Sequence, residues 1–177
     1  MKKLVSLVGG LLALTMLLTL CACGGEAEET PDPAAENEPT QTETVDTVDV
    51  DLTALSAQLV ADCGITDYVD LASDKLISTY QLPADQVVAA AGFNATSSGA
   101  FPQEIVLVQA ADETAAAAVA DQLTARLSSI AEQAASYDPA SLELAENCSV
   151  VTQGVYVGLF FSEHYDAMVS AFQSAVG

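Results

Sequence analysis

The chain has few of the residues that catalysis and nucleic-acid binding usually require. Tryptophan is absent, histidine occurs once, and four lysines and arginines stand against 25 aspartates and glutamates. A chain of this charge repels the phosphate backbone, and the missing basic patch excludes nucleic acid as a partner. Aromatic residues make up only 6% of the sequence, so we expect a core of leucine, valine, isoleucine and many alanines.

The first residues are typical of an export signal. A basic start at 1–3 is followed by an apolar stretch of 17 residues, 4–20, which is at the short edge for a membrane-spanning helix. Ala22 then precedes Cys23, and glycines follow it. A basic start, an apolar middle and a small-residue cleavage site define a signal peptide, so residues 1–22 are predicted to be removed.

Cys23 is the predicted lipidation site. The quartet Leu20-Cys21-Ala22-Cys23 resembles a bacterial lipobox, in which the cysteine thiol receives a diacylglycerol and becomes the new N-terminus. Cys21 is the rival site, but it would place bulky Leu20 at the cleavage junction, where Ala22 fits better. Each buried methylene of an acyl chain contributes about 0.8 kcal/mol, so acylation of Cys23 would make the membrane a durable partner. An uncleaved N-terminal anchor is the alternative.

Residues 23–50 are predicted to be a disordered acidic tether. Ten acidic residues and no basic one lie between Glu26 and Asp51, among many threonines and prolines. Low hydrophobicity with one sign of charge cannot offset the entropy of ordering. Once residues 1–22 are removed, two fixed cations face 25 acidic residues, which gives a formal charge of −23.

The remaining 127 residues, 51–177, suffice for a single domain. Helices are predicted over 51–64, 74–80, 112–136 and 162–176, with a short helical turn at Asp138-Pro139, and strands over 104–109, 148–152 and 155–161. The segment 86–93 alternates like a strand but is rich in alanine, a poor strand former. Taken as a strand, it completes the order strand-strand-helix-strand-strand-helix after two short helices. We therefore expect an α+β domain in two layers, with a mainly antiparallel sheet of about four strands and helices on one face.

His164 is the only histidine, so acid–base or nucleophilic chemistry built on histidine would have to use it. Ser162 is the nearest nucleophile in the sequence, but no Gly-x-Ser-x-Gly elbow surrounds it. We interpret His164 as an exposed residue at the start of the last helix. The protein is therefore expected not to be an enzyme, and an accessory hydrolase is the least favoured alternative.

Two cysteines remain in the predicted domain, Cys63 and Cys148, and the sequence leaves their state open. A disulfide is allowed outside the cell, and it would close a loop of about 85 residues and contribute roughly 4 kcal/mol. Cys63, however, shares an apolar stripe with Leu55 and Leu59, where a buried free thiol is expected. No Cys-x-x-Cys occurs, which argues against zinc and thioredoxin-like chemistry.

Four carboxylates, those of Asp62, Asp67, Asp70 and Asp74, lie within 13 residues in and around predicted loops. Carboxylates are calcium ligands, but the Asp-x-Asp-x-Asp-Gly calcium loop is absent. We interpret these side chains as solvated surface groups and expect neither a metal nor a cofactor. Capture of a small ligand or a divalent cation is the alternative function.

Arg126 is one of two cations among many carboxylates, and it borders the apolar stripe of the long predicted helix. We predict that it pairs with an acidic side chain for a structural purpose, with Glu104 as one candidate. Binding of an anionic ligand is the alternative.

Several stretches of the sequence together resemble one family. They are the lipobox, the acidic tether, Glu104-Ile-Val-Leu-Val before an alanine-rich helix through Arg126, Tyr137-Asp-Pro139, and Gly154-Val-Tyr-Val-Gly-Leu-Phe-Phe-Ser162. Over roughly residues 74–176 the pattern is similar to small lipoproteins of Gram-positive bacteria whose shared domain has no assigned function. None of these marks is a catalytic motif. The resemblance implies a single-membrane bacterium, and hence the extracytoplasmic face of its cell membrane.

The expected function is that of a non-enzymatic binding or envelope-associated module. In this interpretation an acidic extracellular domain is held at the membrane by lipid on Cys23, and its partner is an envelope protein.

Overall fold

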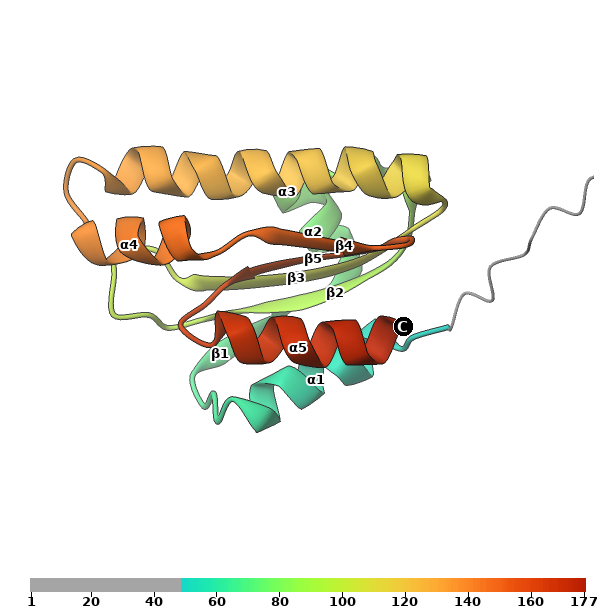
Figure 1. Ribbon diagram of the computed structural model, residues 1–177, viewed down its shortest axis with the longest axis horizontal. Helices are drawn as coiled ribbons and strands as arrows, with labels where there is room; N and C mark the ends of the chain where they lie inside the picture. Colours follow the sequence, from blue (N-terminus) through green and yellow to red (C-terminus); the bar gives the residue numbers. More distant parts are fainter. Residues whose placement is uncertain (1–48) are drawn as a thin grey trace, which may run out of the picture. The chain divides into compact units, whose positions relative to one another are not determined.

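A five-stranded antiparallel sheet forms the centre of the domain, with the strands in the order β1-β2-β3-β5-β4 (Figure 1). The strands are β1 (Tyr68–Leu71), β2 (Val87–Ala95), β3 (Gln103–Ala110), β4 (Val150–Gln153) and β5 (Tyr156–Phe161). The structure, a computed structural model, describes residues 49–177. The predicted signal peptide, Cys23 and all but the last two residues of the predicted tether lie outside the described residues.

The helices are α1 (Leu52–Asp62), α2 (Ser73–Tyr80), the 3-10 helix η1 (Ala84–Gln86), α3 (Glu113–Ala134), α4 (Pro139–Asn147) and α5 (Tyr165–Val176). Helices α1, α2, α3 and α5 begin and end close to the residues that the sequence predicts, whereas α4 extends the predicted turn at Asp138-Pro139 and η1 was not predicted. Asp51 and Asp138 cap α1 and α4 through their side chains. Ala72 stands at the N-cap of α2 and His164 at that of α5, and neither contributes a side-chain hydrogen bond to its cap.

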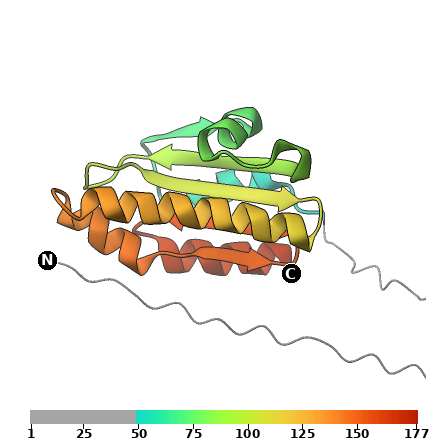
Figure 2. The same ribbon diagram turned by 90° about the horizontal axis from the view of Figure 1, so that it is seen from above.

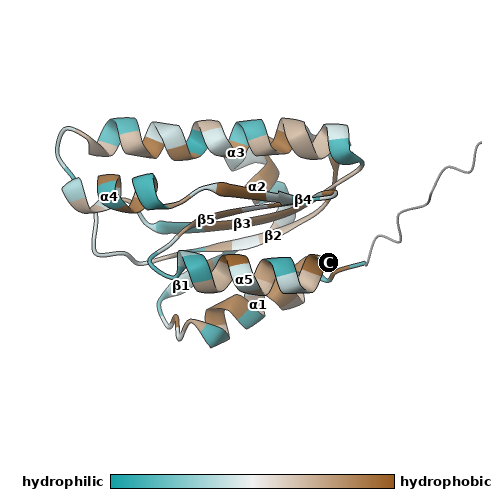
Figure 3. Cartoon of the chain, viewed as in Figure 1, coloured by the Kyte–Doolittle hydropathy of each residue, from teal (hydrophilic) through white to brown (hydrophobic). Residues whose placement is uncertain are grey.

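The α+β class and the antiparallel sheet are confirmed, but helices cover both faces of the sheet instead of one. Helices α2, α3 and α4 contribute to the core on one face, and α1 and α5 to the core on the other (Figures 1 and 3). The reason lies in the central strand β3. Its Val106 and Val108 face the first core while Ile105 and Leu107 face the second, so both faces require cover.

The strand β1 is the one strand that the sequence analysis did not predict. It has only four residues, and two of its three large apolar side chains, those of Tyr68 and Val69, are exposed. It pairs antiparallel with the second half of β2. In Figure 2 β1 and β4 lie at opposite edges of the sheet, with α3 running along it.

Candidate functional site

The carboxylate of Glu104, at the start of β3, is only 3% exposed and has two polar partners. Arg126 on α3 donates to both carboxylate oxygens, with a distance of 3.0 Å from Nε to Oε2. The Tyr80 hydroxyl at the end of α2 donates to Oε2 at 3.0 Å. The predicted partner of Arg126 is therefore confirmed. Tyr80 was missed, since its position on the apolar face of α2 gave no sign of a polar role.

Burial and charge shift the ionisation of this trio in a way that keeps its hydrogen bonds. Burial, reinforced by the adjacent Glu104 carboxylate, raises the pKa of Tyr80. Hydrogen bonding to Glu104 raises the pKa of Arg126. Tyr80 therefore stays a neutral donor and Arg126 stays charged. A carboxylate satisfied in this manner holds α2 and α3 onto the sheet and is poorly suited to act as an acid or base.

Ser162 is fully buried and its hydroxyl is engaged in the fold. The Ser162 Oγ donates to Gln103 Oε1 at 2.6 Å, and Gln103 Nε2 donates to the Thr96 carbonyl at 3.0 Å. Ser162 Oγ also accepts from the backbone N–H of His164 at 3.1 Å. The imidazole itself is exposed, as predicted. The structure thus makes Ser162 a link between β3, β5 and the start of α5.

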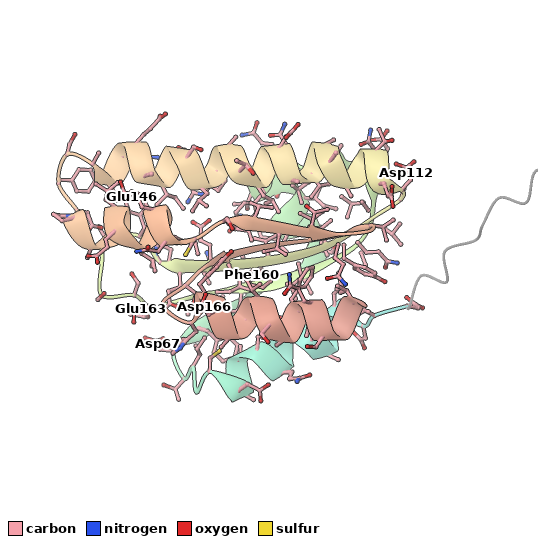
Figure 4. All side chains as sticks on the ribbon, in the orientation of Figure 1. Asp67, Asp112, Glu146, Phe160, Glu163 and Asp166 are labelled. Atoms are coloured by element: carbon pink, nitrogen blue, oxygen red, sulfur yellow. The ribbon has the colours of Figure 1, made fainter. Side chains whose placement is uncertain are left out.

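Two adjoining hollows lie where α4, the loop 97–101 and the start of α5 meet. Their volumes are about 280 and 620 Å³, and both are lined by Leu144, Asn147 and Glu163. The Ser98 hydroxyl donates to Glu163 Oε1 at 3.0 Å. In Figure 4 Glu163 and Asp166 lie at the start of α5, on the side where α4 carries Glu146. Both hollows are open, and each is lined by two acidic residues, Glu163 with either Glu143 or Asp166, which suits contact with another surface better than enclosure of a small molecule.

The carboxylates of Asp62, Asp67, Asp70 and Asp74 are exposed and do not converge. Asp67 Oδ2 accepts from the Thr96 hydroxyl at 2.7 Å, and Asp62 from the Gln58 amide at 3.3 Å. Over residues 49–177 no group of three or more His, Cys, Asp or Glu side chains is placed to hold a metal ion. Nothing in this geometry favours the cation-capture alternative.

Both cysteines of the domain are free, so the disulfide considered between Cys63 and Cys148 is not formed in the structure. Cys63 packs against the core shared by α1 and α5, whereas Cys148 belongs to the core on the opposite face of the sheet. The sheet therefore separates them. Burial raises the pKa of both thiols, which keeps them protonated and slow to react.

No helix in the described part of the chain combines the length and apolar character needed to span a bilayer. The comparisons with known proteins identify one domain. The family model described as a domain of unknown function (DUF4358) matches residues 61–162, which include all five strands and helices α2, α3 and α4. The match thus contains the Tyr80–Glu104–Arg126 trio. Searches of the curated proteins and of the solved structures find no match.

Proposed function

The chain belongs to the family of the domain of unknown function DUF4358, and from this premise we propose that it is a lipid-anchored, non-enzymatic binding module at the extracytoplasmic face of a bacterial cell membrane. The observation that carries the proposal is the lipobox at Leu20-Cys21-Ala22-Cys23 after a basic and apolar leader. The resemblance to small Gram-positive lipoproteins supports the same location. An envelope protein is the partner expected at this location.

The chemistry of the domain supports the non-enzymatic part of the proposal. The Ser162 hydroxyl and the Glu104 carboxylate are buried, and both already form hydrogen bonds within the fold. His164 meets Ser162 through its backbone N–H rather than through its imidazole. These two buried polar groups, the most plausible candidates for catalysis, therefore hold helices onto the sheet.

Processing of the full chain in a lipoprotein-exporting bacterium tests the anchor. Mass spectrometry of the mature protein should find an N-terminal peptide that begins at Cys23 and carries a diacylglycerol. Cys23→Ser should keep the leader and lack lipid, whereas Cys21→Ser, the matched control, should be processed like the wild type. An intact Met1 in the wild type, or an unacylated Cys23, contradicts the proposal.

Assays with peptide, ester and phosphoester substrates test the absence of catalysis. We expect no turnover above background by the purified chain. Turnover that is lost on His164→Ala or Ser162→Ala, in variants that still unfold cooperatively, would make the protein a hydrolase instead.

A further inference from the structure

Four large apolar side chains are exposed in the described part of the chain, and three of them belong to the first two strands of the sheet. Tyr68 and Val69 lie on β1 and Val88 lies near the start of β2, beyond the residues that pair with β1, whereas Tyr137 follows α3. Val69 is 66% exposed and Val88 is 64% exposed, although valine usually lies inside. Proteins normally protect an edge strand with lysine, proline or a cover, because an open edge can pair with another chain. The strand β1 has neither lysine nor proline, and its one charged residue is Asp70.

The backbone of β1 presents hydrogen-bonding groups to the open side. The Thr96 N–H donates to the Asp67 carbonyl at 3.1 Å, which identifies Asp67 and Thr96 as a hydrogen-bonded pair next to the β1–β2 ladder. Hydrogen-bonded pairs alternate along antiparallel strands, so the backbone groups of Val69 point toward β2 while those of Tyr68 and Asp70 point outward. An extended segment can therefore bond to Tyr68 and Asp70 without disturbing the sheet.

The two faces of β1 differ in chemistry. Tyr68 and Asp70 lie on the face that carries α1, and the Tyr68 ring contacts Phe93 edge-on at 5.7 Å between centroids. Val69 and Leu71 lie on the opposite face, where Leu71 packs against the core under α2. An added strand therefore meets an aromatic ring and a carboxylate on one face and aliphatic side chains on the other. Alternating cationic and apolar side chains match this arrangement.

A groove of about 490 Å³ runs along the first of these faces, between β1 and α1. Asp70 and Ser73 line it from the strand side, and Thr53 and Ser56 from α1. Ser56 is only 4% exposed, and its hydroxyl lacks a hydrogen-bond partner within the described residues. A buried polar group without a partner is uncommon and costs free energy. A donor group that enters the groove, such as an ammonium, would meet the exposed Asp70 carboxylate, and the Ser56 side chain belongs to the same lining.

We propose that the β1 edge binds an extended peptide segment of a partner protein, in which cationic and apolar side chains alternate, as a sixth strand of the sheet. The inference rests on the proposed function, since it names the partner of that binding module. Charge argues against a second copy of this chain as the occupant. Asp67 precedes β1 and Asp70 lies within it, so pairing two such edges would place like charges together on a chain that is already strongly acidic.

Hydrogen exchange of the full chain, purified in detergent, tests the proposal with defined probes. One probe is a short peptide that alternates lysine and valine, and its control alternates glutamate and valine. The lysine peptide should slow exchange of the Tyr68 and Asp70 amides and leave that of Thr152, on the opposite edge strand β4, unchanged. The glutamate peptide should protect neither edge. Added salt should weaken binding, because the contacts are exposed.

Substitutions at Asp70 separate the contribution of its charge from that of its outward backbone N–H. Asp70→Asn keeps the outward N–H and removes the charge, and it should weaken lysine-peptide binding by up to about fivefold. Asp70→Pro also removes the N–H and should weaken binding further, since proline is tolerated on the solvent side of an edge strand. Asp121→Asn, on the exposed surface of α3, makes the same charge change away from the edge and should bind like the wild type.

Protection of other elements by the lysine peptide, or of none, would falsify the proposal. So would concentration-dependent dimerisation that is lost on Val69→Lys and kept on Thr152→Lys, since a second copy would then be the occupant. Failure of the lipid anchor is a separate result, because acylation of Cys23 is measured in cells and does not involve β1. An unacylated chain that still binds the peptide would contradict the proposed location at the membrane but would support the β1 edge as a binding surface.

Discussion

At the scale of single residues, the trio of Tyr80, Glu104 and Arg126 shows how a buried charge is tolerated. Taking a carboxylate out of water is costly unless it is paired and fully hydrogen-bonded. Glu104 receives a guanidinium through both oxygens and a phenol through one of them. Removing one partner of such a group leaves a buried charge without compensation. The resulting loss of folding stability is therefore larger than the net stability that the intact pair contributes.

Arg126→Met should lower the free energy of unfolding by about 2 kcal/mol or more. The expected loss is below the 3–5 kcal/mol of fully buried pairs, because the Arg126 side chain is one-third exposed. Urea unfolding followed by circular dichroism measures the change. Lys75→Met, which removes the other cation of the domain from an exposed site, is the control and should stay within about 0.5 kcal/mol.

Adding Glu104→Gln to Arg126→Met should recover part of this loss, since no charge is then left buried. A double variant as unstable as the sum of both single changes would contradict the pairing described for Glu104.

At the scale of elements, α4 is joined to the loop before β3 by its capping residue. The Asp138 carboxylate accepts from the Ser141 N–H of its own helix at 3.2 Å and from the Ala100 N–H of the loop at 2.7 Å. A Cβ on Gly99 would come within 2.2 Å of the Ser141 hydroxyl, so the loop approaches the helix closely only because glycine stands there. The rings of Phe101 and Tyr137 stack at 6.4 Å between centroids beside this contact.

Asp138 should make stability depend on pH. The Ser141 hydroxyl, and after it the Ala100 backbone, hold the pKa of Asp138 below its ordinary value. A carboxyl whose pKa is lower in the folded state stabilises the fold above its unfolded pKa, about 3.9, and loses this effect as the pH falls through the folded value. Asp138→Ala should therefore be less stable than the wild type at neutral pH, and the gap should close in acid.

Thermal unfolding between neutral and strongly acidic pH measures this gap. Thr152→Ala, an exposed change without a titrating group, should follow the wild type at each pH. A gap that stays constant into acid would show that Asp138 acts only through packing.

At the scale of the whole molecule, the dominant property is the excess of negative charge. Lys75 and Arg126 are the only fixed cations beyond Lys3, and Arg126 is already paired with Glu104. Surplus charge of one sign keeps a protein soluble but destabilises its compact state through self-repulsion. The same surplus would attract cationic segments and repel other copies of the chain.

The melting temperature should rise with salt. Between about 0.01 and 0.15 M sodium chloride the Debye length falls from about 30 to about 8 Å, which screens repulsion between carboxylates on different elements. Calorimetry at neutral pH measures the shift. A variant that combines Asp121→Asn with Glu132→Gln on α3 should respond less, and a melting temperature that falls with salt would show that attractive ion pairs dominate instead.

Much of the secondary structure follows from local sequence alone. The apolar stripe of α3, the caps at Asp51 and Asp138, and the turn at Gly154, whose φ is +56°, act through neighbours in the chain, so the sequence predicts them. The pairing of Arg126 with a carboxylate was also predictable, because so few cations are available to so many carboxylates, but from the sequence Glu104 was only one candidate.

Tertiary structure decided the rest, because it depends on which surfaces far apart in the sequence come into contact. Periodicity shows that β3 is apolar on both faces, but it does not reveal that α1 and α5 lie on one face while α2, α3 and α4 lie on the other. The strand β1 forms because it pairs with β2, and four residues of which three are exposed carry too weak a pattern to indicate a strand. The open edge at Tyr68 and Asp70, and with it the proposed binding surface, is therefore a property of the folded sheet.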